Sequence, residues 1–305
     1  TQEQIRKAVE IKKNIFWLGI VDYASQNFHG YSIAPQGTTY SSYLVKDSKN
    51  GLFDTVKGEF TDEFICQLRT VSQPEEIDYI VVNQVELDHS GALAELVALC
   101  KPEKIICSTV GKATMEQHFD TTGWPIEAKK TGDKINIGSR DIEFIEARML
   151  HWPDSMFSYI PQDKLLISND AFGENIASSE RFSDEISRCI LEHAMSEYYY
   201  NIILPFSPRV QAVLKQIEEL KLDIDMIAPD HGLIIRGKED VSYVISLYSS
   251  YAAQETKKRA LILYDTMWES TAAMANAIAE GIEAAGVPVR VMHLKQHHHS
   301  MVMSE

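Results

Sequence analysis

The sequence predicts an α/β protein whose β-sheets are covered by helices. The chain has 305 residues, 45% of them hydrophobic, so it can bury a substantial core and fits a prior of roughly two domains. Short apolar runs typical of strands alternate with segments whose apolar residues recur at helical spacing. Several of the apolar runs end in acidic or histidine residues, and strand ends are where a rigid scaffold presents functional side chains.

Composition excludes several classes of function. The formal charge of -15 argues against a nucleic-acid surface, because binding phosphates requires clustered Lys and Arg. The four cysteines form no C-x-x-C pair, as expected for reduced thiols in the cytoplasm. No apolar stretch approaches the ~20 residues of a membrane span. We therefore expect a soluble cytoplasmic protein that acts on small molecules or protein partners.

The first half of the chain is a series of predicted strands and helices. Phe60, Phe64 and Leu68 have the spacing of an amphipathic helix over residues 59–71, and Pro74 stops it. Strands are expected at residues 15–20, 42–45, 51–56, 79–82, 105–108 and 141–147, and further helices at 92–100 and 112–119.

The loop after the apolar run at residues 79–82 carries the densest group of candidate ligands. Its sequence, Asn83-Gln-Val-Glu-Leu-Asp-His89, alternates, which predicts that Gln84, Glu86 and Asp88 project to one side. Carboxylates held close together repel unless a proton or a metal cation lies between them. The loop therefore favours a metal-binding edge, and the alternative is a solvated acidic turn.

Three later strands end in a similar way. His151 precedes a Trp-Pro turn, Asp170 follows an apolar run, and His231 follows the run at residues 226–229. A lone histidine at a strand end is more often a packed polar residue than a ligand. With the loop at residues 83–89, however, four strand ends present ligand-type residues, which favours one shared metal site.

The order of these motifs is similar to that of the metallo-β-lactamase fold, whose pattern is H-x-[HED]-x-D-H, then His, Asp and His. Glu86 in place of the second histidine points to the flavodiiron proteins, also called A-type flavoproteins. The segments that resemble this family run from about residue 16 to the last residue, and they are FHGY, GTTY, LFDTVK, ELDHSGAL, MLHWPDSM, LISNDAFG, ERFSD and PDHG.

The resemblance implies an αββα sandwich followed by a flavodoxin-like domain. It also implies a pair of irons that reduces dioxygen to water or nitric oxide to nitrous oxide. The ligands would be Glu86 and His151 on one iron, Asp88, His89 and His231 on the other, and a bridging Asp170. Mixed imidazole and carboxylate ligands suit redox-active iron better than the zinc of hydrolases.

One position departs from the family's pattern. Where the family has the first histidine of its motif, this sequence has Gln84, and the flanking residues align without a gap. An amide oxygen is a weaker, neutral donor than imidazole, so the iron held by Glu86 and His151 is expected to bind less tightly or to gain a water. Alternatively, Gln84 ligates through its oxygen or only hydrogen-bonds to a metal-bound water.

The resemblance assigns two further residues to catalysis. His29, in the segment FHGY, and Tyr199, in a pair of tyrosines, match segments that line the family's substrate pocket, where they would donate hydrogen bonds to the substrate. The alternative is that this aromatic cluster belongs to the core. Trp152 is expected either near an incoming cofactor or in packing.

The polar stretch at residues 254–259 marks the expected boundary between a diiron domain at residues 1–255 and the incomplete start of a flavodoxin-like, doubly wound FMN domain at 256–305. Met274, Ile278 and Ile282 share one face of a predicted helix. Hydroxyls and N–H groups at the start of that helix form an anion cradle, and the resemblance assigns it to the FMN phosphate. The expected FMN contacts are Thr266, Met267, Trp268, Ser270 and Thr271.

The resemblance also implies partners. Electrons would pass from a rubredoxin-type donor to FMN and then to the irons. Each flavin would lie against the irons of the partner subunit, so a head-to-tail homodimer is expected. Two alternatives remain: a metal-dependent hydrolase of the same fold and a metal-depleted binding scaffold. The sequence does not choose between dioxygen and nitric oxide.

Overall fold

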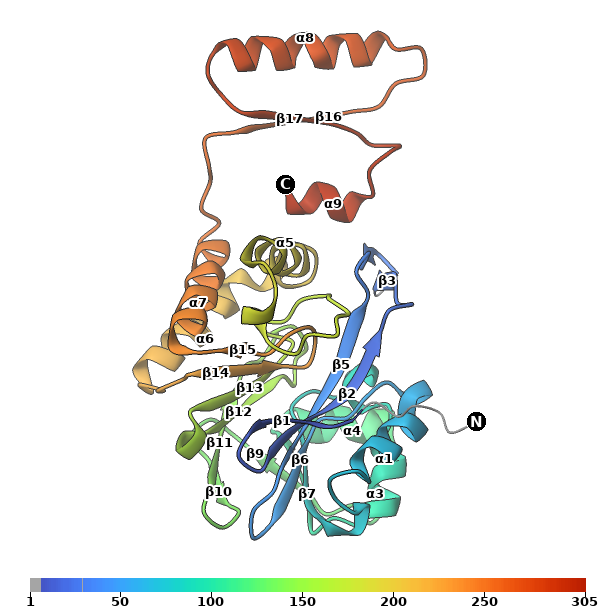
Figure 1. Ribbon diagram of the computed structural model, residues 1–305, viewed down its shortest axis with the longest axis vertical. Coiled ribbons are helices and arrows are strands. Elements are labelled where there is room, and N and C mark those ends of the chain that lie inside the picture. The colour runs from blue at the N-terminus through green and yellow to red at the C-terminus, as the bar shows by residue number, and fades with distance from the viewer. Residues whose placement is uncertain (1–6, 29) are drawn as a thin grey trace.

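The computed structural model describes residues 7–28 and 30–305 of the chain. Over these residues two β-sheets pack face to face, and helices cover the outer face of each (Figure 1). The layer order is helix, sheet, sheet, helix, which confirms the predicted αββα sandwich.

The first sheet combines antiparallel and parallel strands. β2 and β5 pair antiparallel, whereas β6, β7, β8 and β9 run parallel. Two neighbouring parallel strands must be joined by a crossover connection, and the helices α1, α3 and α4 lie in these connections. In spatial order the strands are β1 (Val9–Lys12), β2 (Ile15–Asp22), β5 (Thr38–Val45), β6 (Asn50–Phe53), β7 (Ile77–Val82), β8 (Lys104–Ser108) and β9 (Ile126–Lys129). The helices are α1 (Thr61–Leu68), α3 (Leu93–Cys100) and α4 (Gly111–His118).

The second sheet faces the first and is covered by later helices. Its neighbours pair antiparallel except β13 and β14, which are parallel and are joined through α5 and α6. In order the strands are β10 (Lys134–Asn136), β11 (Asp141–Glu146), β12 (Met156–Ile160), β13 (Leu165–Asn169), β14 (Met226–Pro229) and β15 (Ile235–Arg236). The helices are α5 (Arg188–Tyr198), α6 (Ser207–Glu219) and α7 (Lys238–Ala252).

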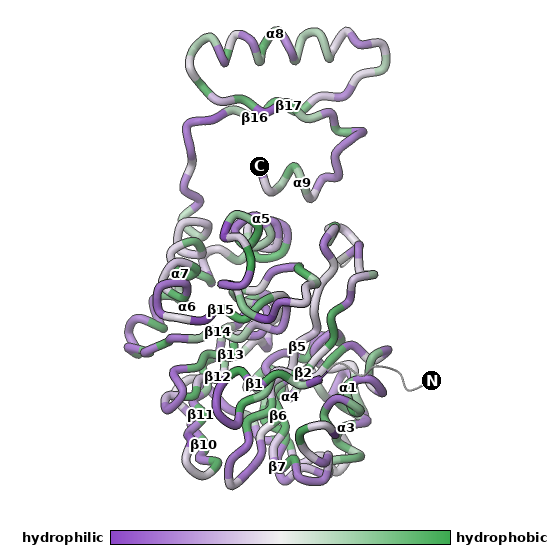
Figure 2. Tube along the Cα trace, in the orientation of Figure 1, coloured by the Kyte–Doolittle hydropathy of each residue, from purple (hydrophilic) through white to green (hydrophobic). Residues whose placement is uncertain are grey.

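The layers enclose separate apolar cores. Along β2 and β5, Trp17 and Tyr43 point into the core between the two sheets, whereas Leu18 and Leu44 point into the core under the helices. Both faces of these strands are therefore buried, which explains why β2 is apolar without alternation and why the Thr and Ser side chains of β5 are buried as well. Figure 2 shows the hydrophobic residues concentrated along the strands of the sandwich.

The loop after β7 is not extended as its alternating sequence predicts. The strand ends at Val82, and Leu87–Ser90 form a helical turn, α2. Backbone N–H groups of His89 and Ser90 both bond to the carbonyl of Glu86 at 2.9 Å, and the Ser90 hydroxyl donates to the carbonyl of Val85 at 2.6 Å. These local bonds close the turn, so Glu86 and Asp88 do not share one side of a strand.

The last part of the chain forms a small unit of its own. β16 (Ala260–Tyr264) pairs in parallel with β17 (Val289–His293), and α8 (Ser270–Ala284) lies between them in sequence. Ala272 and Ala275 are the buried face of α8, while Met274 and Ile278 are 63% and 53% exposed. Met274 and Ile278 of the predicted apolar face are therefore exposed, and alanines occupy the buried positions of α8.

The chain then returns to the sandwich. α9 (His299–Ser304) lies beside α5 (Figure 1), and the Ser300 carbonyl accepts a hydrogen bond of 3.0 Å from the amide of Asn201. A short hairpin, β3 (Asn27–Phe28) with β4 (Ser32–Ile33), approaches the same helix, where the N–H of Ile33 donates to Ser300. No helix in the described part of the chain is long and apolar enough to cross a bilayer.

Candidate metal centre

The predicted metal ligands come from separate segments that the fold brings together. Each segment directly follows a strand, whose hydrogen bonds to its neighbours fix the position of the strand end. They are the loop after β7 with Glu86, Asp88 and His89, the turn between β11 and β12 with His151, and the ends of β13 and β14 with Asp170 and His231.

One group of ligands consists of Glu86, His151 and Asp170, whose ligand atoms all lie within 4.8 Å of one another. His151 Nε2 is 3.3 Å from Glu86 Oε2 and 3.4 Å from Asp170 Oδ2. The Leu150–His151 peptide bond is cis. Two carboxylates and one imidazole converging at this distance are a donor set for a transition-metal ion.

A second group consists of Asp88, His89 and His231, again within 4.8 Å. His231 Nε2 is 3.3 Å from Asp88 Oδ2, and His89 Nε2 is 3.5 Å from Asp88 Oδ1. Both histidines are buried. This group has two imidazoles and one carboxylate, so it is richer in nitrogen than the first.

Asp170 belongs to both groups. Its Oδ1 lies 3.0 Å from His89 Nε2 and 3.4 Å from His231 Nε2, while its Oδ2 faces His151. The two oxygens of one buried carboxylate thus face different ligand groups. This is the arrangement of a carboxylate that bridges two metal ions.

The electrostatics of the cluster fit bound cations. Burial by itself would raise the pKa of Asp170, but the neighbouring histidines hold it well below its ordinary value. Burial likewise opposes charge on His89, yet Asp88 and Asp170 hold its pKa well above the usual range. Asp88 Oδ1 and Asp170 Oδ2 are buried and accept no hydrogen bond from the described residues. Oxygens in that state suit a divalent cation, which would leave the histidines neutral as ligands.

The outer nitrogens of two histidines are anchored. His231 Nδ1 donates to the backbone carbonyl of Thr39 at 2.6 Å, and His89 Nδ1 lies 3.3 Å from Asp230 Oδ2. Asp230 Oδ2 also accepts a 2.8 Å hydrogen bond from the side chain of Asn169. These contacts aim both Nε2 atoms at the cluster. The sequence signal for Asp230 was the Pro-Asp-His-Gly segment, in which only the histidine was singled out.

Gln84 is fully buried and stands two residues before Glu86 in the same loop. Its Nε2 donates a 3.0 Å hydrogen bond to Ser155 Oγ, and its Oε1 accepts no hydrogen bond from the described residues. The amide therefore has a fixed end and an unsatisfied end. Ser155 was not among the residues that the sequence marked, because a lone serine carries no motif.

The two adjacent tyrosines have different surroundings. The hydroxyl of Tyr198 donates to Asp170 Oδ1 at 3.1 Å, whereas that of Tyr199 lies 3.0 Å from Ser207 Oγ. Tyr198 ends α5, and Tyr199 begins a π-helical turn, so the two side chains leave the helix in different directions. The fold thus brings Tyr198, not Tyr199, to the metal ligands. His29 lies outside the described residues.

The predicted FMN loop is exposed at the start of α8. Met267 and Trp268 are among the most exposed large side chains, and Glu269 has a left-handed backbone just before the helix. No side chain among the described residues caps the N-terminus of α8, and an uncapped helix N-terminus offers its first N–H groups to an anion. The five predicted contacts lie together in this loop and the first turn, Thr266, Met267, Trp268, Ser270 and Thr271.

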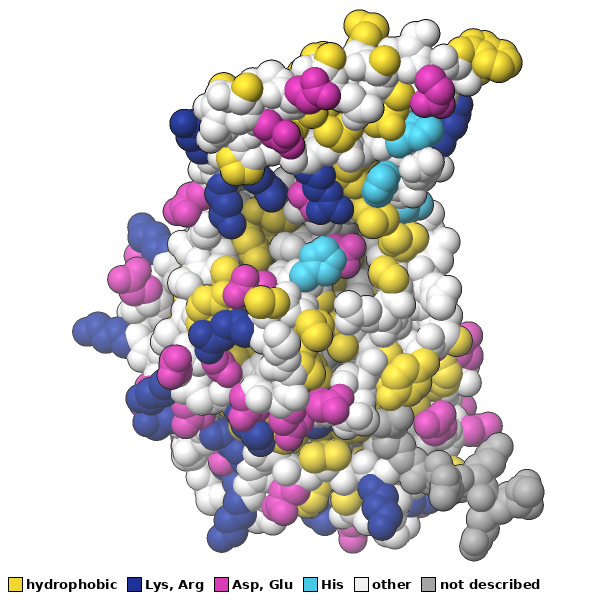
Figure 3. All heavy atoms as spheres, turned by 45° about the horizontal axis from the view of Figure 1, so that its top comes forward, with side chains coloured by type: hydrophobic (Ala, Val, Ile, Leu, Met, Phe, Trp, Pro, Cys, Tyr) yellow, Lys and Arg dark blue, Asp and Glu magenta, His cyan; other side chains and the backbone are white. Residues whose placement is uncertain are grey.

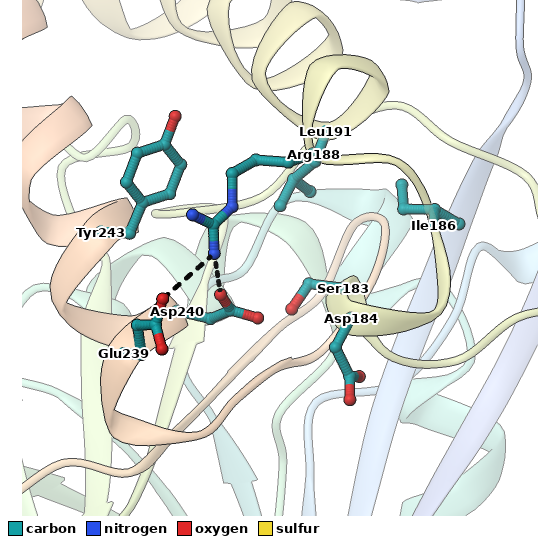
Figure 4. A pocket seen from close by; sticks show the side chains of 8 residues that line it. All are labelled: Ser183, Asp184, Ile186, Arg188, Leu191, Glu239, Asp240 and Tyr243. Carbon is teal, nitrogen blue, oxygen red and sulfur yellow. Dashed lines mark hydrogen bonds and ion pairs between the residues drawn. The ribbon is translucent and has the colours of Figure 1, made fainter.

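Two surface pockets lie away from the ligands. One pocket, of about 290 Å³, is lined by Arg188, which forms ion pairs with Asp240 at 2.7 Å and with Glu239 at 3.9 Å (Figure 4). The other, of about 780 Å³, lies between α5, α7 and the C-terminal unit. Acidic and basic side chains are interspersed over the face drawn in Figure 3. None of the predicted metal ligands lines either pocket.

Comparison with known proteins agrees with this geometry. The model of the family described as "ODP family beta lactamase" matches residues 39–232, which contain every predicted metal ligand. Rubredoxin-oxygen oxidoreductase of Megalodesulfovibrio gigas is 44% identical over 98% of this chain and 74% of its own length. Nitric oxide reductase of Moorella thermoacetica is 39% identical over 97% of this chain and 74% of its own length.

A solved structure matches nearly the whole chain as well. The flavodiiron protein from Giardia intestinalis is 27% identical, with a TM-score of 0.94 over 99% of this chain and 73% of that one. The similarity therefore includes the C-terminal unit as well as the sandwich. This chain spans about three quarters of the length of the relatives that it matches.

Proposed function

This chain belongs to the flavodiiron proteins, and on that premise we propose that it reduces dioxygen to water, nitric oxide to nitrous oxide, or both, at a pair of irons. The observation that carries the proposal is the position of Asp170, whose two oxygens face separate groups of ligands. One relative is named for dioxygen and another for nitric oxide, so both substrates belong to the proposal.

The proposed irons have different ligand sets. One would be held by Gln84, Glu86 and His151, the other by Asp88, His89 and His231, with Asp170 shared. When bound, such a pair supplies electrons and takes hold of both atoms of a diatomic substrate. The protein contributes the fixed geometry: strand ends carry the ligands, and Thr39 and Asp230 orient two of the imidazoles.

Tyr198 supplies a hydrogen-bond donor beside the ligands. Its buried hydroxyl donates to Asp170, and burial raises its pKa well above the ordinary value, so it stays protonated. We assign to Tyr198 the role that the sequence suggested for Tyr199, whose hydroxyl is bound to Ser207 instead. The role predicted for His29 as a second donor remains a prediction.

The C-terminal unit fits the start of an FMN domain. We propose that residues 256–305 belong to that domain and residues 1–255 to the diiron domain. The exposed loop before α8 and the uncapped helix N-terminus support a phosphate contact there. Electrons would then pass from a rubredoxin-type donor, as the name of one relative suggests, through FMN to the irons. In a head-to-tail homodimer each flavin would face the partner's irons.

The free cysteines support a proposal for the cell compartment. We propose a cytoplasmic location, because all four thiols are free in the described structure and such thiols persist in a reducing compartment.

Metal analysis tests the proposal. The apo-protein is loaded with Fe(II) under argon, and the iron content per chain and the Mössbauer spectrum are measured before dioxygen or nitric oxide is added with a reductant. We expect about two irons per chain, a spectrum of a coupled pair and consumption of substrate. A protein that binds only zinc and cleaves an ester or thioester would instead be a metal-dependent hydrolase of the same fold. A protein that binds no metal would be a scaffold.

A further inference from the structure

Ser155 links two of the segments that carry metal ligands. Its Oγ accepts a hydrogen bond of 3.0 Å from Gln84 Nε2 and a second of 3.2 Å from the backbone N–H of Trp152, the residue after His151. Both Ser155 and Gln84 are fully buried. The two bonds occupy both acceptor positions of the hydroxyl, so one serine fixes Gln84 relative to the turn of His151.

We infer that Ser155 is a positioning residue, which holds the amide of Gln84 so that Oε1 faces the iron shared by Glu86 and His151. The inference rests on the proposed function and deepens it, since it says how a glutamine serves at a position where the family has histidine. An amide has one donor end and one acceptor end, and Ser155 takes the donor end. With one N–H bound to Ser155, the oxygen lies at the other end of the amide and is its only acceptor.

The oxygen of Gln84 has the properties of a ligand atom. Oε1 is buried and accepts no hydrogen bond from the described residues. A buried carbonyl without a partner destabilises a fold, and native structures rarely keep one. A hard cation satisfies it, because amide oxygens bind hard ions without needing to lose a proton.

A second contact fixes the same stretch of chain. The backbone N–H of Val85 donates to Asp154 Oδ2 at 2.8 Å, next to the bond between Gln84 and Ser155. The Ser108 hydroxyl donates to the backbone carbonyl of Asp154 at 2.7 Å, which restrains the backbone of this turn. Asp154 and Ser108 therefore fix the backbone, and Ser155 is left to orient the side chain of Gln84.

The arrangement makes the two metal positions unequal. With Gln84 bound through oxygen, the first position has oxygen ligands from Gln84, Glu86 and Asp170 and a single imidazole from His151. The second position has two imidazoles. A harder donor set holds Fe(II) less tightly, so the first iron should be the weaker one and should have its own spectroscopic signature.

A double-mutant cycle tests the role of Ser155. Fe(II) is titrated anaerobically into the apo-protein against a chromophoric chelator, for the natural sequence, Ser155→Ala, Gln84→Ala and the double variant. If Ser155 acts through Gln84, Ser155→Ala weakens the first iron by about 10-fold, the usual effect of losing an orienting partner, and adds nothing in the Gln84→Ala background. The Mössbauer doublet of that iron changes while the other stays.

Ser108→Ala is the matched control. It removes another buried serine hydroxyl that bonds to the same turn but not to Gln84, so any effect of Ser108→Ala on iron affinity should be the same with and without Gln84→Ala. Equal losses from Ser155→Ala with and without Gln84 would overturn the inference, because Ser155 would then act through Trp152 and His151. No loss at all would also overturn it. A natural protein that binds no iron at saturating Fe(II) would reject the proposed function together with it.

Discussion

The hydroxyl of Tyr198 donates a 3.1 Å hydrogen bond to Oδ1 of Asp170, the carboxylate that both groups of metal ligands share. Tyr198 is the last residue of helix α5, which packs against the second sheet and so fixes the position of this neutral hydroxyl. It lies beside the ligands without being one, so its effect on turnover is separable from its effect on metal binding.

Tyr198→Phe should therefore slow the reaction and leave the metals in place. We expect turnover with dioxygen or nitric oxide to fall about 10-fold, the value of one hydrogen bond of about 1.4 kcal/mol, while iron per chain stays near two. Tyr199→Phe is the control, because its hydroxyl is bound to Ser207, and it should keep the natural rate. Equal losses in both variants would contradict the assignment.

Asp170→Ala should remove both irons. Its two oxygens face the two ligand groups, so no other described side chain replaces it in either. The sandwich should remain folded, because the ligands follow strand ends and the apolar cores do not include Asp170. Iron analysis tests the loss of both irons, and circular dichroism tests whether the sandwich stays folded. A variant that retains both irons would remove Asp170 from the bridging position.

Gln84→His tests whether the amide weakens the first metal position. Imidazole binds Fe(II) better than an amide oxygen, so iron content and turnover should rise together if the natural site is incompletely filled. The two proteins are compared for iron per chain and for substrate consumption. Equal iron and equal rates would mean that Gln84 already serves as a competent ligand. Less iron in the variant would mean that the loop, with its bond from Gln84 to Ser155, fits glutamine better than an imidazole ring.

The thiols should differ in their reaction with iodoacetamide. Burial raises the pKa of Cys100 and of Cys107 to about 12, so both stay protonated as the pH rises toward that value, and the thiolate is the reactive form. At about pH 8 we expect label on the exposed Cys189 and none on Cys100 or Cys107. Peptide mass spectrometry measures the labelling, with unfolding in guanidinium as the control. Native labelling of Cys107 as fast as Cys189 would contradict its burial within β8.

The local structure was largely readable from the sequence. Apolar runs placed β7, β13 and β14 close to their true limits, because a strand buried on both faces needs continuous apolar side chains. The same reading failed just after β7. There the hydroxyl of Ser90 and the carbonyl of Glu86 close a helical turn, and local hydrogen bonds of that kind compete with an alternating pattern.

By itself the sequence determined which residue types stand at the strand ends and hence that Glu86, His151 and Asp170 are candidate ligands. The family resemblance implied how the ligands divide into two groups, and the tertiary structure gave that division its physical basis, because it depends on distances between segments of the two sheets. It also decided which of two adjacent tyrosines reaches Asp170, since the helix changes to a π-turn between them. The partner of Gln84 was equally hidden, because Ser155 lies 71 positions away in sequence and meets it only when the two sheets pack together.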